Sequence, residues 1–233
     1  MDLCHSGKDL IMSGQATDVV IDYETLGPPP RCKVLELSAV PFVDDPYNPP
    51  TFAQLVAGGR KYKFDIRKQK NRLSNQATIE WWRKQDPEAK KILKPLPDDL
   101  DLYQGHEQFM KDLKTDGISF WDSLIYCRGP EFDYSILIDV IRDTHGWEAD
   151  LFKIMPTAFW NTRDVRTTIE NRLMSRGVAK TPLPLGVLDG FIAHDSIHDC
   201  AKDALMIIYA SRYALGLQDA PEGDQIDPLS IQK

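Results

Sequence analysis

Residues 18–25 read DVVIDYET, an apolar run that ends in two acids one residue apart. If this run is a β-strand, Asp22 and Glu24 lie on the same face, about 6.5–7 Å apart along the backbone. Two carboxylates at the end of a buried strand are costly unless a cation lies between them. The stretch therefore predicts a site for a hard divalent cation such as magnesium, manganese or calcium. The alternative, which the common Asp-x-Glu pattern favours when taken alone, is an exposed strand end with two solvated acids.

A second acid follows another apolar run farther along the chain. Residues 126–133 read YCRGPEFD, in which Gly129 and Pro130 predict a turn into a helix. Asp133 then lies near the first turn of that helix, where the partial positive charge of the helix N-terminus stabilises an ionised acid. The alternative is a helix-start aspartate with no other role, because aspartate is common at this position.

The third segment, AHDSIHDCAKDA from Ala193, contains two overlapping His-x4-Asp spacings. One joins His194 to Asp199, and the other joins His198 to Asp203. A histidine in the loop before a helix can reach over a cation held by an aspartate in the first turn. This arrangement suits a general base that acts on a water molecule. The alternative is a charged, solvated helix start with a serine cap.

Together the three segments resemble the DnaQ-like 3′→5′ exonucleases of the DEDDh type. The residues that match the four acids and the histidine of this family are Asp22, Glu24, Asp133, Asp199 and His194. A member of the family resembles the chain over about residues 18–230. The similar stretches include TIEWW from Thr78, CRG from Cys127, FWN from Phe159 and LDGF from Leu188.

The resemblance implies an α/β protein with a ribonuclease H-like fold, in which helices flank a mixed central sheet. The exonuclease domain covers residues 17–216, between a flexible N-terminal extension at 1–16 and a C-terminal tail at 217–233. The hydrophobic periodicity predicts the elements within it. Strands are expected at 18–25, 32–42, 61–67 and 118–127, and helices at 76–85, 103–115, 132–143, 163–175 and 196–215.

The register of the third segment follows from the small residues that the family places after its last aspartate. From Asp199 these positions hold Cys200 and Ala204, whereas from Asp203 they hold Ala204 and a bulkier isoleucine. The first register fits better, and it leaves the histidine in the loop before the helix. His194 with Asp199 is therefore the preferred pair, and His198 with Asp203 is the alternative.

The resemblance also implies hydrolysis of a phosphodiester by two divalent ions, Mg²⁺ or Mn²⁺. Asp22 would bridge both ions, and Asp133 would support the cluster. Glu24 and Asp199 would help to hold the ion nearer the attacking water, whose proton His194 would accept.

Contacts with the substrate are expected beside the acids. In the family, the residues after the first two acids seat the terminal nucleotide, and here these are Thr25 and Leu26. Leu26 is equally well explained as a buried loop residue. Trp81 and Trp82 lie side by side on an expected helix, where one can pack in the core while the other stacks on a base. Phe132, next to the third acid, completes the expected contacts.

A basic stretch at 60–72 contains seven Lys or Arg residues and one acid. With its interleaved aromatics it is a candidate path for the phosphates of the strand, through Lys61, Lys63 and Arg67. The alternative is a solvated edge strand whose lysines prevent aggregation. The net charge of −7 argues against broad, non-specific attraction to nucleic acid, but bound divalent ions offset an acidic site.

Composition limits the remaining possibilities. The 233 residues, 42% of them hydrophobic, suit one domain with a substantial core. No apolar run approaches the ~20 residues that span a bilayer. Residues 1–16 lack the apolar core of a signal peptide, so a cytoplasmic protein is expected. No obligate protein partner is evident from the sequence. The four cysteines are widely spread, which makes a zinc site or a disulfide framework unexpected.

The resemblance favours single-stranded DNA as the substrate. Two alternatives remain open from the residues alone: an exoribonuclease that trims short RNA or RNA tails, and a non-catalytic nucleic-acid-binding module on the same fold. Discrimination of the ribose 2′-hydroxyl depends on pocket contacts that the sequence does not reveal.

Overall fold

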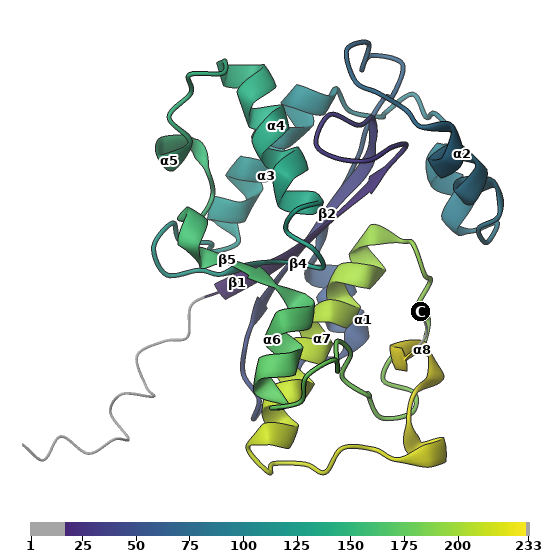
Figure 1. Ribbon diagram of the computed structural model, residues 1–233, viewed down its shortest axis with the longest axis vertical. Coiled ribbons are helices and arrows are strands. Elements are labelled where there is room, and N and C mark those ends of the chain that lie inside the picture. The colour runs from purple at the N-terminus through teal and green to yellow at the C-terminus, as the bar shows by residue number, and fades with distance from the viewer. Residues whose placement is uncertain (1–16, 232–233) are drawn as a thin grey trace, which may run out of the picture.

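The computed structural model describes residues 17–231, so the extension expected at 1–16 lies outside the described residues. A sheet forms its centre (Figure 1). It is mixed and five-stranded, in the order β3-β2-β1-β4-β5. β2 is antiparallel to β1 and β3, whereas β4 is parallel to β1 and β5. The strands are β1 (Thr17–Thr25), β2 (Val34–Val43), β3 (Arg60–Lys63), β4 (Ile125–Cys127) and β5 (Thr162–Asp164).

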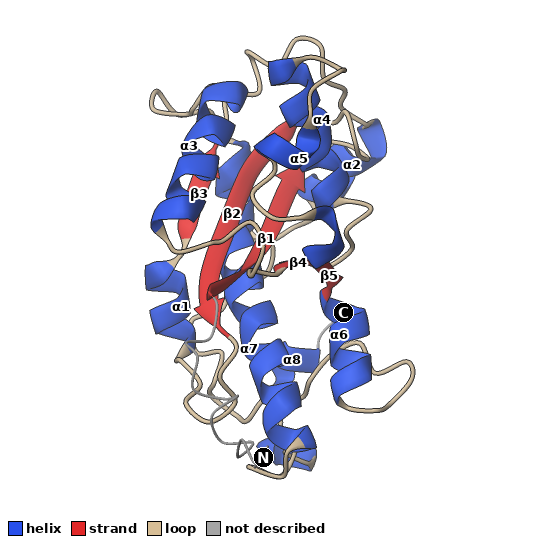
Figure 2. Ribbon diagram, turned by 90° about the vertical axis from the view of Figure 1, so that its left-hand side faces the viewer, coloured by secondary structure: helices blue, strands red, loops and turns tan. Residues whose placement is uncertain are grey.

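Helices cover both faces of this sheet (Figure 2). α3 and α4 pack on one face, and α1, α6 and α7 pack on the other. α2 lies at the end of β1, beside these layers (Figure 1). The α-helices are α1 (Phe52–Gly58), α2 (Gln76–Arg83), α3 (Leu102–Thr115), α4 (Asp133–His145), α5 (Leu151–Ile154), α6 (Val165–Arg172), α7 (Ser196–Ala214) and α8 (Pro228–Ile231), with short 3-10 helices η1 (Ala89–Leu93), η2 (Phe159–Asn161) and η3 (Gly223–Gln225).

The alternation of β1 divides its residues between the two faces. Val19, Ile21 and Tyr23 join the core beneath α3 and α4, whereas Val20 joins the core beneath α6 and α7. Because side chains two apart share a face, the two acids of β1 are directed to the α7 side. The expected mixed sheet with flanking helices is confirmed.

Several element boundaries differ from the prediction. The strand expected at 61–67 ends at Lys63, because the Asp65 carboxylate accepts the N–H of Arg67 at 2.9 Å and turns the chain. The strand expected at 118–127 is confined to Ile125–Cys127, because a turn at 119–123 precedes it. The helix expected from residue 163 begins at 165, where Asp164 caps it. The strand β5 and the helices α1 and α5 were not predicted.

The C-terminal segment, predicted as a polar tail at 217–233, packs against the loop before α7 as far as the structure describes it. The Asp227 N–H donates to the carbonyl of Leu183 at 2.8 Å, and the Asp227 carboxylate accepts the N–H of Leu188 at 3.1 Å. Ser230 accepts the N–H of Leu183 at 3.2 Å. Because these polar groups satisfy the backbone of a loop, the polar composition of the segment does not indicate a free tail.

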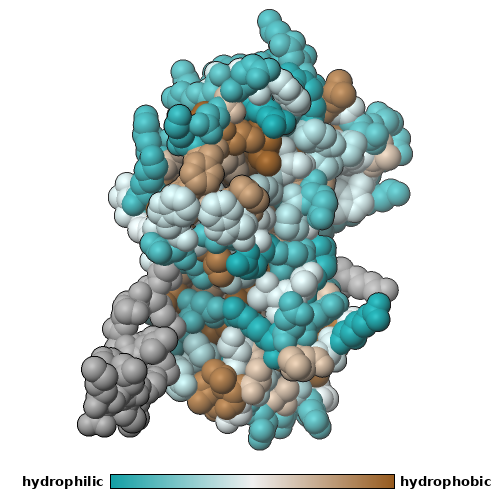
Figure 3. Space-filling view, turned by 60° about the vertical axis from the view of Figure 1, so that its left-hand side comes forward, coloured by the Kyte–Doolittle hydropathy of each residue, from teal (hydrophilic) through white to brown (hydrophobic). Residues whose placement is uncertain are grey.

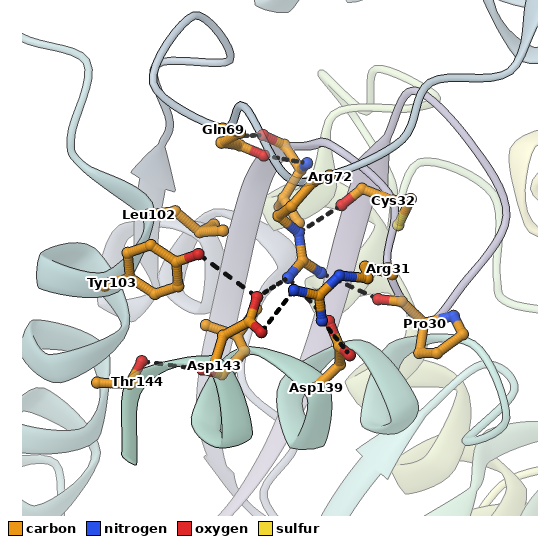
Figure 4. A network of polar contacts seen from close by, with 12 residues as sticks. Pro30, Arg31, Cys32, Gln69, Arg72, Leu102, Tyr103, Asp139, Asp143 and Thr144 are labelled. Atoms are coloured by element: carbon orange, nitrogen blue, oxygen red, sulfur yellow. Dashed lines mark hydrogen bonds and ion pairs between the residues drawn. The ribbon is translucent and has the colours of Figure 1, made fainter. Parts of the chain in front are cut away.

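An arginine–aspartate network holds α4 in place (Figure 4). Arg72, whose side chain is completely buried, binds Asp139 at 2.8 Å and the carbonyl of Cys32 at 2.7 Å. Arg31 binds Asp143 at 2.7 Å. The network connects the loop before β2, which holds Arg31, and the loop after β3, which holds Arg72, to α4. It thereby fixes the helix that begins with Asp133.

Exposed aromatic residues gather near α5 and the start of β5. Figure 3 looks onto this side and shows hydrophobic side chains among hydrophilic ones in its upper half. Their rings contact one another, and four of the five side chains are at least 45% exposed. The members of this cluster are Phe120, Trp121, Phe152, Phe159 and Trp160.

Two further observations concern the described residues as a whole. Cys32, Cys127 and Cys200 are free and buried. Within residues 17–231, no helix combines the length and the hydrophobicity that crossing a membrane requires.

Candidate active site

A cleft of about 850 Å³ opens at the end of β1, between α2 and the start of α7. All four acids and the histidine that were singled out in the sequence line it. They come from three distant segments of the chain: Asp22 and Glu24 from β1, Asp133 from α4, and His194 and Asp199 from the last loop and helix.

The first three acids are brought together by the end of β1 and the start of α4. Gly129, with a φ of 124°, adopts a conformation that favours glycine and turns the chain into α4. The Asp133 carboxylate then accepts the backbone N–H of Tyr23 at 3.0 Å. Because Tyr23 lies between Asp22 and Glu24, this hydrogen bond holds Asp133 against both strand acids.

The fourth acid and the histidine come from the other side of the cleft. Asp199 lies in the first turn of α7, and its carboxylate accepts the backbone N–H of His194 at 3.0 Å. Potential ligand atoms of Glu24, His194 and Asp199 lie within 4.8 Å of one another. A divalent cation held by the carboxylates of Glu24 and Asp199 would lie beside the imidazole of His194.

The pKa values of the acids show the electrostatic cost of this cluster. Burial, and next the charge of Glu24, raise the pKa of Asp22 well above its usual value. Burial, and next Asp199, do the same to the pKa of Glu24. Burial is also the largest cause that raises the pKa of Asp133 and of Asp199 to about 7. A bound cation would remove this cost, so the residues present fit a divalent metal site.

The two alternative partners in the third segment have other contacts. Asp203 accepts hydrogen bonds from Arg128 Nε at 2.9 and 3.0 Å and is only 5% exposed. The His198 ring packs against Phe52 at 5.3 Å, and its Nδ1 accepts the N–H of Ile192 at 3.0 Å. His198 does not line the cleft, whereas Asp203 lines it as the partner of Arg128.

The expected substrate contacts are only partly found in the cleft. Thr25, Trp81, Trp82 and Phe132 line it. Leu26 does not: it is 8% exposed and packs in a small core with Trp82. These surroundings agree with the alternative interpretation of Leu26 as a buried loop residue.

The basic stretch at 60–72 is not brought into the cleft. Lys61 binds Asp195 at 2.6 Å, Lys63 binds Asp99 at 2.7 Å, and Arg67 binds Asp65 at 2.8 Å. The alternative interpretation as an edge strand agrees with the position of β3, which is the last strand on its side of the sheet.

Other basic residues line the cleft and were missed. Lys202 follows Asp199 by three residues. Because this spacing places both residues on one face of α7, the sequence could have indicated that Lys202 lies beside the acid. Arg166, in the first turn of α6, donates to the carbonyl of Arg128 at 2.6 Å. The basic side chains that line the cleft are Arg128, Arg166, Lys180 and Lys202.

A protein family and a phage protein match most of this chain. Residues 17–209 match the family described as the 3′-5′ exoribonuclease Rv2179c-like domain. The exodeoxyribonuclease of Enterobacteria phage T4 is 46% identical over 221 residues, which cover 92% of this chain and 97% of the phage protein.

Solved structures of two other nucleases match most of this chain at low identity. Cell-death related nuclease 4 (CRN-4) has a TM-score of 0.49 at 13% identity, and the match covers 91% of this chain and 66% of that protein. Exonuclease I has a TM-score of 0.44 at 13% identity, and the match covers 88% of this chain and 42% of exonuclease I. This chain thus spans less than half the length of exonuclease I.

The predicted mixed central sheet with helices on both of its faces is confirmed. The family match covers most of the chain, and the phage relative is similar over nearly its whole length. The chain therefore belongs to the Rv2179c-like 3′-5′ exoribonuclease domain family, and its class of activity is that of an exonuclease.

Proposed function

We propose that this protein is a metal-dependent 3′→5′ exonuclease that shortens single-stranded DNA and releases nucleoside monophosphates. The observation that carries the proposal is the proximity of Glu24, His194 and Asp199, whose ligand atoms lie within 4.8 Å of one another beside two further acids. A histidine among carboxylates in a cleft combines a proton acceptor with cation ligands, which is what hydrolysis of a phosphodiester requires.

In this proposal Asp22, Glu24, Asp133 and Asp199 hold two divalent ions, Mg²⁺ or Mn²⁺. When bound, the ions would neutralise charge that develops on the phosphate and lower the pKa of water. The tight packing of Asp133 against the backbone of Tyr23 keeps one carboxylate oxygen directed at β1. The remaining oxygens of the cluster are the ones available to cations.

His194 accepts the proton of the attacking water. The water oxygen forms a bond to phosphorus, the bond to the 3′-oxygen of the preceding nucleotide breaks, and that oxygen takes up a proton from solvent. Burial lowers the pKa of His194 from its usual value, which favours the neutral imidazole that can accept a proton. Its half-buried position in the cleft leaves it accessible to water.

The name of the phage relative and the description of the family indicate different substrates. The phage relative is an exodeoxyribonuclease, and its similarity to this chain over nearly the whole length of both supports DNA. The family description names an exoribonuclease, which makes trimming of RNA the second candidate. A non-catalytic binding module is disfavoured, because the four acids and the histidine that hydrolysis would use all line one cleft.

Oligonucleotides labelled at the 5′ end test the proposal. DNA and RNA strands of one sequence are incubated with Mg²⁺ or Mn²⁺, and the products are separated by length. We expect a ladder of stepwise 3′ shortening on DNA, loss of activity with a chelator, and no ladder with Asp22→Ala. Faster shortening of RNA would favour the second candidate, and an active Asp22→Ala variant would refute the proposed site.

A further inference from the structure

The contacts of His194 raise the question of what orients its ring. Its backbone has a φ of 63°, in the left-handed region that residues other than glycine rarely adopt. The hydrogen bond from its N–H to Asp199, at 3.0 Å, fixes this backbone. That bond does not determine the direction of the imidazole, which has to be set by contacts of the ring itself.

The ring contacts come from α2, on the opposite side of the cleft. The Trp81 and His194 ring centroids are 4.8 Å apart, with the planes at 79°. Trp82 lies behind Trp81, at 5.1 Å and 79°, and its own ring is 6.5 Å from His194. Edge-to-face contacts of this kind prefer a defined orientation, so Trp81 restricts the rotation of the imidazole.

The tryptophan pair is in turn attached to β1. Trp82 is only 1% exposed, and its indole N–H donates to the carbonyl of Thr25 at 2.8 Å. The start of α2 is attached to the same segment, because the Asn75 N–H donates to the carbonyl of Leu26 at 2.7 Å. Thr25 directly follows Glu24. A continuous series of contacts therefore runs from the strand acids through Trp82 and Trp81 to the His194 ring.

We propose that Trp81 is a positioning residue, which holds the His194 imidazole toward Glu24 and Asp199 through the edge-to-face contact of the two rings. This inference rests on the proposed function, in which His194 accepts the proton of water. It differs from the role of Trp81 as a stacking surface for a base, although the 41% exposure of Trp81 is compatible with both. The two roles affect different kinetic constants: a positioning residue acts on kcat, whereas a stacking surface acts mainly on KM.

A double-mutant cycle separates the two roles. The kcat and KM values for a short single-stranded DNA with Mg²⁺ are measured for the wild type, Trp81→Ala, His194→Ala and the double variant. We expect Trp81→Ala to lower kcat by about 10- to 100-fold, with KM changed by less than about twofold. In the His194→Ala background the same substitution should cause no further loss, because its effect passes through the histidine.

Two more variants complete the experiment. Trp81→Phe keeps an aromatic ring and should retain most of kcat, whereas Trp81→Leu keeps volume without a ring and should behave like Trp81→Ala. If Trp81→Ala does not fold, Trp81→Leu takes its place in the cycle. Trp147→Ala, at a tryptophan that is 71% exposed and outside the cleft, is the matched control and should have wild-type kinetics.

Failure of the positioning role and failure of the proposed function would give different results. A raised KM with unchanged kcat, or losses that multiply in the double variant, would overturn the positioning role and leave the proposed nuclease intact. A wild-type protein without nuclease activity, or full activity of His194→Ala, would instead refute the proposed function on which the inference rests.

Discussion

Asp203 of α7 and Arg128 at the end of β4 form a two-oxygen ion pair, with both carboxylate oxygens within 3.0 Å of Arg128 Nε. The pair lies in the same cleft as the acid cluster, one helical turn beyond Asp199. The Arg128 guanidinium thus compensates the negative charge of the Asp203 carboxylate. Among residues 17–231, the hydrogen bond that the Asp199 carboxylate accepts comes from the backbone N–H of His194, which leaves its other oxygen for another ligand.

The different partners of these two aspartates predict different effects of the same substitution. Asp199→Asn should reduce turnover by at least about 100-fold with little loss of stability, because it removes a cation ligand. Asp203→Asn should lower the free energy of unfolding by about 2–3 kcal/mol, because Arg128 loses its charged partner in a partly buried position. Thermal melts and rates on one DNA substrate check both. Greater activity of Asp199→Asn than of Asp203→Asn would contradict the assignment.

The two histidines provide a second, independent comparison. His194→Ala should lower turnover by about 10²–10⁴-fold, because it removes the proton acceptor in the cleft. His198→Ala should keep most of the turnover and mainly lower stability, because its ring packs on Phe52 and its Nδ1 accepts the N–H of Ile192. The reverse result would show that the alternative register, with His198 as the base, is correct.

The acid cluster predicts how stability depends on pH in the absence of metal. The pKa values of Asp133 and Asp199 are about 7 in the folded protein, against a usual value of 3.8. At these two groups the folded state therefore binds more protons than the unfolded state between these values, so their contribution to stability is fully present below about pH 4 and is lost as pH rises through about 7.

Asp22→Asn should reverse part of this decline. Removing one negative charge from the cluster should raise the melting temperature of the metal-free protein at pH 8 by about 2–6 °C, and by less at pH 5.5. Mg²⁺ or Mn²⁺ should raise the melting temperature of the wild type more at pH 8 than at pH 5.5, because protons compete for the carboxylates. Equal metal-induced shifts in the wild type and in Asp22→Asn would contradict a role for this acid as a ligand.

Local patterns predicted those parts of the site that depend on local geometry. A strand has a side-chain period of two, so the sequence DVVIDYET was enough to place Asp22 and Glu24 on one face. A Gly-Pro turn was enough to place Asp133 at a helix start. The mixed sheet with flanking helices was implied by the resemblance to a known family, and the order of the predicted elements fits a mixed α/β domain.

The features that were not predicted depend on contacts between residues that are distant in sequence. Lys61 is one of several basic residues in a row, but its partner Asp195 is 134 positions away, and no pattern near residue 61 reveals it. Arg128 meets Asp203 across 75 positions. The strand β5 has three residues, and it is recognisable only through its pairing with β4. These features arise when the chain folds back on itself, so local periodicity did not contain them.

The salt dependence of DNA binding should distinguish the basic residues of the cleft from those of β3. Arg166→Ala should reduce the slope of log affinity against log salt by about 0.7, the value for one phosphate contact on a single strand. Lys63→Ala, which removes a cation already paired with Asp99 outside the cleft, is the matched control and should leave the slope unchanged. Binding is measured with catalytically inactive Asp22→Asn protein. A reduced slope for Lys63→Ala alone would restore the original interpretation of the basic stretch.

The C-terminal segment should contribute to activity although it contains none of the proposed catalytic residues. Asp227, 3% exposed, accepts the N–H of Leu188 in the loop that leads to His194, and the carbonyl of Leu229 accepts a hydrogen bond from the cleft residue Lys202 at 2.6 Å. Asp227→Ala leaves the buried N–H of Leu188 without its acceptor, which should cost about 1–3 kcal/mol of stability. We expect a lower melting temperature together with a lower kcat, because the loop before α7 loses its support.

Two variants make this last prediction specific. Asp227→Asn keeps an oxygen acceptor and should recover most of the stability and turnover, whereas Asp224→Ala changes an exposed acid of the same segment and should have no effect. Melting temperature and kcat are measured for all three variants in the same buffer with Mg²⁺. If Asp227→Ala and Asp224→Ala gave the same values, the segment would not support the loop. If Asp227→Ala lowered stability but left kcat unchanged, its contacts would stabilise the fold without affecting the position of His194.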